Sequence, residues 1–285
     1  MKFCFIGGDF RNIELAKMLA KDGMLVYTYG LERGFLEKDF NQQIIQCENL
    51  DQGINKAEII ITALPFSKDD KKINTPLSEE KLEIEEIINK IKRKIIFTGN
   101  ISKEVKEKFD KENIKFFDIL KNEEFAILNT VPTAEATIKI IIENTKNIIQ
   151  NSRCLIMGFG RIGKILSYKM QSLSLKTIVI PTNSIEEAWG KAYGNEIITF
   201  ENIKDKKEIL SKYDIIINTI PKIILKEEEL KNIRKDALII DLASKPFGID
   251  RNFIKNEKMN FIEALGLPRK NCTSYSCKKY KRNSI

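Results

Sequence analysis

The stretch "CLIMGFGRIGKILSYKM", from Cys154 to Met170, decides the fold. It begins with an apolar run typical of a buried strand, and apolar residues at helical spacing follow its glycines. Between the two lies the pattern G-x-G-x-x-G. In this context the first glycine allows a tight turn, the second lets the backbone approach a pyrophosphate, and the third lets strand and helix pack closely. We therefore expect a dinucleotide site formed by Gly158, Phe159, Gly160, Arg161, Ile162 and Gly163.

Strand-like and helix-like stretches alternate on both sides of this motif, which predicts parallel sheets covered by helices. The predicted fold is α/β, with a Rossmann-like NAD(P)-binding domain and an N-terminal doubly wound α/β domain joined by a long helix. The expected boundaries are 1–128 for the N-terminal domain, 129–150 for the linker helix and 151–268 for the Rossmann domain. Residues 269–285 form a basic tail.

A second glycine turn, "IGGDFR", follows the first predicted strand of the chain. Gly7 and Gly8 precede Asp9 and Arg11, and a third glycine is missing. We interpret this turn as part of a substrate domain; the alternative is a second, degenerate nucleotide site.

Charge and composition narrow the function classes. The net charge is +8, but six basic residues and no acidic one lie from Arg269 onward, so removing those six leaves +2 for the rest. Lys and Glu interleaved on helix faces indicate a solvated surface, and we predict no nucleic-acid partner. No apolar run approaches the roughly 18–20 residues of a membrane span, so no membrane association is expected. Five scattered cysteines without a CxxC pair predict a reducing compartment and no metal site.

The cofactor type is indicated where the second strand of the nucleotide domain ends. An acidic residue there favours NAD, because it bonds the ribose hydroxyls, whereas a basic residue accommodates the 2′-phosphate of NADP. Pro181 is followed there by Thr182, Asn183 and Ser184, which are neither acidic nor basic and can bond a phosphate. The stretch favours NADP and leaves NAD open.

Two later strands of the same domain end in "NTIP" (218–221) and "DLAS" (241–244). Ligands bind outside the carboxyl ends of such strands, so we expect Thr219, Ile220, Pro221 and Ala243 beside the nicotinamide. Ordinary turn chemistry is the alternative explanation.

The chain contains no histidine. This excludes dehydrogenases that need a histidine acid–base group near neutral pH, as well as histidine-based zinc sites and Ser-His-Asp triads. What remains is redox chemistry that needs a weak base, or a base supplied by Lys, Asp, Glu or Tyr.

Six segments together resemble one family: "IGGDFR", "NTVPTAEATIKIIIENT", "LIMGFGRIGK", "DIIINTIP", "IIDLASKPFGID" and "ALGLP". Their order and spacing along about residues 1–268 resemble the A subunit of dipicolinate synthase. The resemblance implies an NADP-dependent oxidoreductase that forms dipicolinate, during sporulation, from the product of dihydrodipicolinate synthase, on a branch of the lysine and diaminopimelate pathway. It also implies a partner in the flavoprotein-like B subunit, a homo-oligomer, and the cytoplasm of the mother cell of a spore-forming bacterium.

The implied substrate is a cyclic imine dicarboxylate and the product is an aromatic pyridine. Aromaticity supplies driving force, so hydride transfer with a modest base or water suffices. As donors to the two carboxylates we expect Arg11, Thr133, Ser244 and Lys245, at strand ends or at the start of the linker helix, facing an interdomain cleft. Glu135 or Asp9 is the expected proton acceptor.

The sequence also departs from the family pattern. An Arg often follows the second nucleotide-domain strand in the family, and Phe247 stands where Pro-Gly-Gly is usual. After Gly266-Leu267-Pro268 the resemblance stops at Arg269. Back-translation displaced by one base gives a family-like continuation, so we interpret 269–285 as frameshifted and non-native.

Two other functions stay open. The first is a different NADP-dependent two-domain dehydrogenase, resembling shikimate or methylene-tetrahydrofolate dehydrogenases. The second is a non-catalytic NAD(P) sensor that binds nucleic acid through its basic tail.

Overall fold

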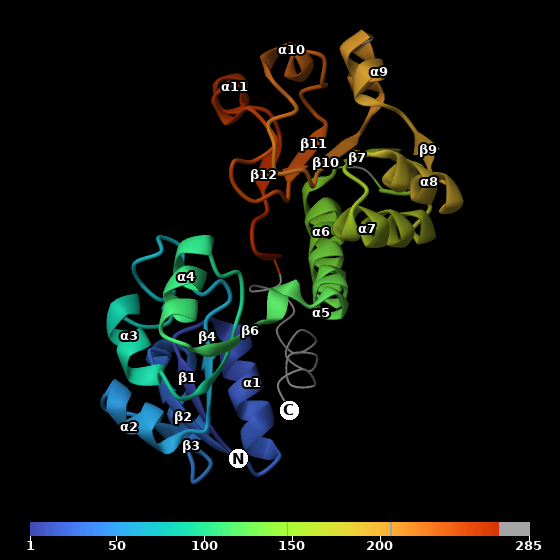
Figure 1. The fold of residues 1–285 in the computed structure, drawn as a ribbon. Coiled ribbons are helices and arrows are strands. Elements are labelled where there is room, and N and C mark those ends of the chain that lie inside the picture. The colour runs from blue at the N-terminus through green and yellow to red at the C-terminus, as the bar shows by residue number, and fades with distance from the viewer. Residues whose placement is uncertain (147, 206, 268–285) are drawn as a thin grey trace. The chain divides into compact units, whose positions relative to one another are not determined.

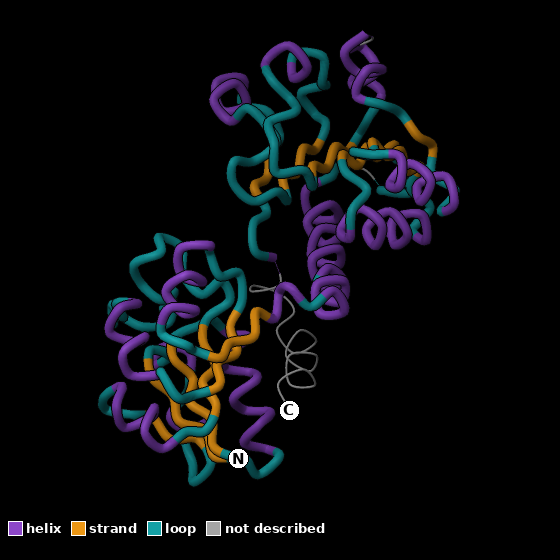
Figure 2. Tube along the Cα trace, in the orientation of Figure 1, coloured by secondary structure: helices purple, strands orange, loops and turns teal. Residues whose placement is uncertain are grey.

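The computed structural model describes residues 1–146, 148–205 and 207–267. These residues form two compact units, 1–129 (unit 1) and 130–267 (unit 2), each visible as a separate sheet with helices in Figures 1 and 2. The predicted α/β class, with a Rossmann-like second domain, is confirmed. The predicted frameshifted tail, 269–285, lies outside the described residues.

Unit 1 is built on a parallel sheet of six strands in the order β3-β2-β1-β4-β5-β6. The strands are β1 Lys2–Ile6, β2 Leu25–Tyr29, β3 Ile44–Gln46, β4 Ile59–Thr62, β5 Ile95–Thr98 and β6 Lys115–Asp118. The helices are α1 Phe10–Lys21, α2 Leu50–Lys56, α3 Ile84–Ile91, α4 Lys103–Lys111 and α5 Glu123–Leu128.

Strand β1 shows why the sheet needs helices on both faces. Successive side chains of a strand point to opposite faces. Phe3 and Phe5 pack with residues of α1 on one face, whereas Cys4 and Ile6 pack with residues of α2, α3 and α4 on the other. All four are fully buried. The apolar run therefore specifies a central strand.

Unit 2 repeats this topology, with a parallel sheet in the order β12-β11-β10-β7-β8-β9. Its strands are β7 Arg153–Met157, β8 Lys176–Ile180, β9 Glu196–Ile197, β10 Ile215–Asn218, β11 Leu238–Asp241 and β12 Phe261–Glu263. Its helices are α6 Thr130–Asn144, α7 Arg161–Ser172, α8 Ser184–Ala192, α9 Phe200–Asp205, α10 Glu227–Leu230 and α11 Arg251–Glu257. Helices α6 and α7 cover one face, and α9, α10 and α11 cover the other.

The helix expected over 129–150 is shorter than predicted and belongs to unit 2. Helix α6 ends at Asn144, and its residues Ala134, Ala136 and Ile141 are part of the core beneath the sheet. The helical segment Glu123–Asn144 is long and apolar enough to cross a membrane by length and composition, contrary to the expectation from the sequence. Of its most apolar window, 44% is buried, as in a core helix of a folded domain.

Candidate functional site

The glycine turn of unit 2 lies between β7 and α7, at the point where the strand order reverses between β7 and β10. Gly158 has φ +92, and a Cβ there would lie 2.4 Å from Thr219 Oγ1. A Cβ on Gly163 would lie 2.2 Å from the Gly158 carbonyl oxygen. The first glycine therefore provides the tight turn and the third the close packing, as the motif predicted.

The second glycine behaves differently. Gly160 is the N-cap of α7 with an ordinary φ of −72, and a Cβ there would meet only Glu186 Oε1, at 3.6 Å. The described residues of unit 2 leave room for a side chain at Gly160. The open space above it lies at the N-terminus of a twelve-residue helix, where N–H groups and the helix dipole favour a phosphate.

The loop after β8 is joined to an acidic side chain that the sequence alone did not reveal. Glu186 Oε2 accepts hydrogen bonds from the Phe159 N–H at 3.1 Å, the Thr182 N–H at 2.8 Å and the Thr182 hydroxyl at 2.9 Å. The Asn183 side chain caps α8 by accepting the Glu186 N–H at 2.9 Å. Ser184 is the first residue of that helix. Thr182 and Asn183, expected to bond a phosphate, thus have local partners, and a carboxylate lies against the glycine loop.

The expected nicotinamide-side residues lie next to the same turn. The Thr219 N–H and hydroxyl both donate to the Met157 carbonyl at 2.9 Å, and Ile220 would contact a Cβ on Gly158. Pro221 is exposed, whereas Ala243 is buried. Thr219 and Ile220 are therefore brought against the glycine loop.

Beneath these loops lies a buried polar network. Asn218 and Asp241 are both 0% exposed. Asp241 Oδ1 accepts from Asn218 Nδ2 at 2.9 Å and from the Ala243 N–H at 3.1 Å, and Oδ2 accepts from the Gly248 N–H at 3.1 Å. Asn218 in turn bonds both backbone groups of Ile220. One carboxylate thus fixes the two loops that end β10 and β11.

We expect Asp241→Ala to lower the free energy of unfolding by about 3 kcal/mol, because three buried donors lose their acceptor. Urea unfolding followed by circular dichroism measures the change. The matched control is Asp236→Ala, which removes an exposed carboxylate paired with Arg234 at 3.1 Å and is expected to cost less than about 1 kcal/mol. Equal losses in the two variants would contradict a structural role for the network.

The turn after β11 carries two of the expected catalytic residues. Ser244 and Lys245 are exposed, and the Ser244 carbonyl accepts the Phe247 N–H at 2.8 Å. Phe247 has φ +73, which favours glycine, and its ring lies over the Arg251 guanidinium at 3.2 Å. The backbone here keeps a glycine-like conformation although the residue is phenylalanine.

On α6, Thr133 is buried, and Glu135 pairs with Lys169 of α7 at 2.8 Å. This ion pair ties α6 to the helix that follows the glycine loop. Glu135 thus has a cationic partner on the helix of the dinucleotide motif.

In unit 1, Asp9 and Arg11 form one assembly. Asp9 caps α1 by accepting the Arg11 N–H at 3.0 Å, and it also accepts from Arg11 Nε and Nη2, each at 3.0 Å. Arg11 Nη2 donates to the Leu64 carbonyl as well. Both Asp9 oxygens are engaged, so this carboxylate is better suited to positioning Arg11 than to accepting a proton.

The glycine turn of unit 1 is covered by the loop that follows β4. The Gly8 N–H donates to the Asn74 carbonyl at 3.1 Å, and a Cβ on Gly7 would lie 2.9 Å from Thr75 Cγ2. Protein atoms therefore occupy the space in which a pyrophosphate would approach. This geometry favours the substrate-domain interpretation over a second nucleotide site.

Family models match both units. Residues 2–120 match the N-terminal domain of the dipicolinate synthase A subunit. Residues 139–246 match the NAD-binding domain of D-isomer specific 2-hydroxyacid dehydrogenases. Unit 2 is thus a nicotinamide-dinucleotide-binding domain of dehydrogenase type.

Individual proteins agree with these matches. The dipicolinate synthase A subunit of Bacillus subtilis is 27% identical over 278 residues, or 94% of this chain and 89% of that protein. The crystal structure of the same enzyme's A chain from Bacillus subtilis has a TM-score of 0.83 at 23% identity and shares the fold over 100% of this chain and 94% of that one. The shikimate dehydrogenase (NADP(+)) of Clostridium botulinum is 34% identical over 103 residues, which are 34% of this chain and 39% of that enzyme.

The shikimate dehydrogenase likeness is confined to about a third of the chain, whereas the dipicolinate synthase likeness runs over nearly all of it. The N-terminal domain match adds a unit that is specific to one family. The resemblance seen in the six sequence segments is thus confirmed: this chain is similar to dipicolinate synthase A subunits over nearly all of its length.

Proposed function

We propose that this chain is the dehydrogenase subunit of a dipicolinate synthase. It oxidises the cyclic imine dicarboxylate made by dihydrodipicolinate synthase to dipicolinate during sporulation, in the cytoplasm of the mother cell. A homo-oligomeric assembly and a flavoprotein-like B subunit are part of the proposal. The observation that carries it is the likeness to dipicolinate synthase A subunits of a chain whose unit 2 has the strand–glycine turn–helix geometry of a dinucleotide site.

In this proposal unit 2 holds the dinucleotide and unit 1 supplies substrate-binding groups. A bound nicotinamide would supply the hydride acceptor, and the substrate ring, on losing a hydride and a proton, would become aromatic. We keep Arg11, Thr133, Ser244 and Lys245 as proposed donors to the carboxylates. Glu135 remains the proposed proton acceptor, and Asp9 is reassigned to holding Arg11 through its two 3.0 Å contacts.

The cofactor type is the point on which the geometry and the sequence disagree. The sequence favours NADP, and the Clostridium botulinum relatives are named for NADP(+). Glu186, however, places a carboxylate 3.1 Å from the Phe159 N–H, beside the loop that ends β8. A carboxylate at this position bonds ribose hydroxyls and repels a 2′-phosphate. We therefore propose that NAD is preferred and that NADP binds more weakly.

A coupled assay tests the reaction. Aspartate semialdehyde, pyruvate and dihydrodipicolinate synthase supply the substrate, and this chain is added with NAD or NADP, with and without the B subunit. We expect dipicolinate, followed by its ultraviolet absorbance, to form only when both the chain and a dinucleotide are present. A folded chain that binds dinucleotide but yields no dipicolinate would contradict the proposal.

Shikimate, supplied with NADP, serves as the negative-control substrate. Because the likeness to shikimate dehydrogenase covers only 39% of that enzyme, we expect no measurable oxidation of shikimate. Turnover of shikimate at a rate comparable to dipicolinate formation would favour the other two-domain dehydrogenase.

A further inference from the structure

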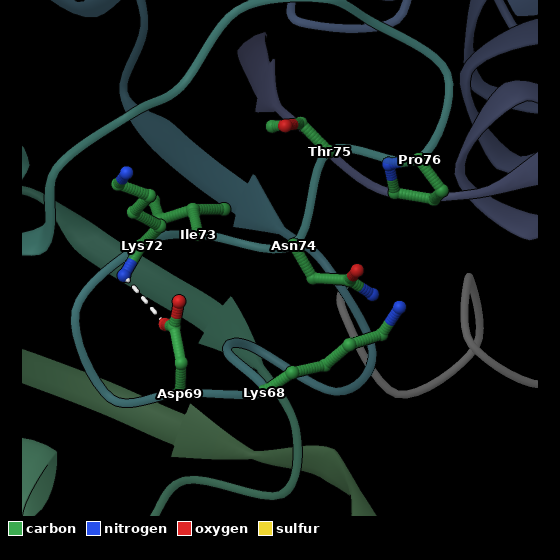
Figure 3. Close-up of a pocket in the computed structure, with 7 residues that line it drawn as sticks. All are labelled: Lys68, Asp69, Lys72, Ile73, Asn74, Thr75 and Pro76. Carbon is green, nitrogen blue, oxygen red and sulfur yellow. Dashed lines mark hydrogen bonds between the residues drawn. The ribbon is translucent and has the colours of Figure 1, made fainter.

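Unit 1 contains a pocket of about 250 Å³ lined by residues 68–76, in the loop between β4 and α3. Figure 3 shows its lining, in which Lys68 and Asn74 come from opposite ends of the loop segment. The pocket lies next to the carboxyl ends of β1 and β4. The Asn74 carbonyl accepts the N–H of Gly8, which follows β1, at 3.1 Å, and the Asn74 N–H donates to the carbonyl of Phe66, which follows β4, at 2.9 Å. In this strand order the switch point lies between β1 and β4, where α/β sheets bind ligands.

Asn74 is the feature that points to a ligand. It is 7% exposed, and among the described residues its Nδ2 has no hydrogen-bond partner although the atom is buried. The two backbone hydrogen bonds hold the residue in place. A buried amide donor without an acceptor is costly to keep, and an acceptor atom from a bound molecule would remove that cost.

The charges around the pocket indicate what kind of acceptor fits. Figure 3 shows the Lys68 ammonium and the Asn74 carboxamide nitrogen pointing toward one another. Among the described residues no carboxylate pairs with Lys68. Two donors that converge without an acceptor between them match the two oxygens of a carboxylate.

The other two charged side chains that line the pocket, those of Lys72 and Asp69, are engaged elsewhere. Lys72 pairs with Glu83 at 3.3 Å. Asp69 Oδ1 accepts the N–H groups of Lys72 at 2.9 Å and Lys71 at 3.0 Å, and these hydrogen bonds lower the pKa of Asp69. Its charge is thus directed at its own loop, which leaves Lys68 and Asn74 to define the pocket.

We propose that Asn74 and Lys68 form a carboxylate-binding subsite of unit 1. It rests on the proposed function for the identity of its ligand, which would be one carboxylate of the cyclic imine dicarboxylate or of dipicolinate. The subsite adds two residues to the proposed substrate-binding groups and assigns a role to a loop without regular secondary structure.

Titration calorimetry with the full chain in chelator-treated buffer tests the subsite, with dipicolinate, pyridine and inorganic phosphate as probes. We expect dipicolinate to bind, Lys68→Met to weaken it at least about tenfold, and Asn74→Asp to abolish it, because a carboxylate there repels the ligand. Lys68 is exposed, so its variant folds even if the Asn74 variant does not. Lys71→Met, in the same loop but outside the pocket lining, is the control and should change the affinity less than about twofold.

Nitrogen–proton correlation spectra give a second readout, because the Asn74 carboxamide signals should shift on addition of dipicolinate and not of pyridine. Phosphate binding as tight as dipicolinate, and equally sensitive to Lys68→Met, would overturn the carboxylate assignment. Dipicolinate binding that neither variant alters would overturn the subsite while leaving the proposed function to the coupled assay. Absence of dipicolinate binding to the unaltered chain at millimolar concentration would also overturn it.

Discussion

Gly160→Ala is expected to weaken dinucleotide binding at least about tenfold, or about 1.4 kcal/mol, while leaving the chain folded. The φ of −72 suits alanine, and the added methyl group would meet only Glu186 Oε1, at an ordinary 3.6 Å. The same methyl group would stand where the backbone must approach the pyrophosphate. Fluorescence titration with NADH measures the affinity, and thermal unfolding measures the stability.

Two other glycines provide the controls. A Cβ on Gly163 would lie 2.2 Å from the Gly158 carbonyl oxygen, so Gly163→Ala should lose stability as well as binding. Gly194 has φ +71 and nothing within 4 Å of its Cβ position; Gly194→Ala should cost about 1 kcal/mol of backbone strain without altering the affinity. If Gly160→Ala bound NADH with unchanged affinity, the glycine loop would not be part of the dinucleotide site.

The sequence predicted well those features that depend on neighbouring residues. The glycine loop was placed correctly because one short segment contains the strand, the turn and the helix start. Buried apolar runs such as Phe3–Ile6 indicate strands directly. Strand β3, Ile44–Gln46, gives no such signal, because three residues at a sheet edge are too short to show periodicity.

Features that depend on contacts between separate elements could not be predicted in the same way. Glu186 lies in the first turn of α8, and its bond to Phe159 joins residues 27 positions apart. A capping signal, Asn183 followed three residues later by a glutamate, was available, but it does not say where the carboxylate points. Asn74 lies in a loop without periodicity, and backbone hydrogen bonds to Gly8 and Phe66 fix its position.

The choice between NAD and NADP should depend on the Glu186 carboxylate. We expect the unaltered chain to bind NAD at least about tenfold more tightly than NADP, since a carboxylate about 4 Å from a phosphate charge costs between about 1 and 4 kcal/mol, depending on the local dielectric. Glu186→Gln should bring the two affinities within about threefold of each other, mainly by improving NADP binding. The amide oxygen can still accept from Phe159 and Thr182, so the loop should keep its shape.

Titrations with 5′-AMP and adenosine 2′,5′-bisphosphate isolate this effect, because the two ligands differ only in the 2′-phosphate and need no substrate. The control is Glu187→Gln, which removes the neighbouring carboxylate, paired with Lys191 at 2.6 Å, and should leave the ratio of affinities unchanged. In the unaltered chain, higher salt should bring the affinities for 5′-AMP and the bisphosphate closer together, because salt screens the charge of Glu186. In Glu186→Gln, which lacks that charge, salt should have little effect on the ratio of the two affinities. If Glu186→Gln and the unaltered chain both prefer the bisphosphate, Glu186 does not face the ribose, and the preference for NADP indicated by the sequence stands.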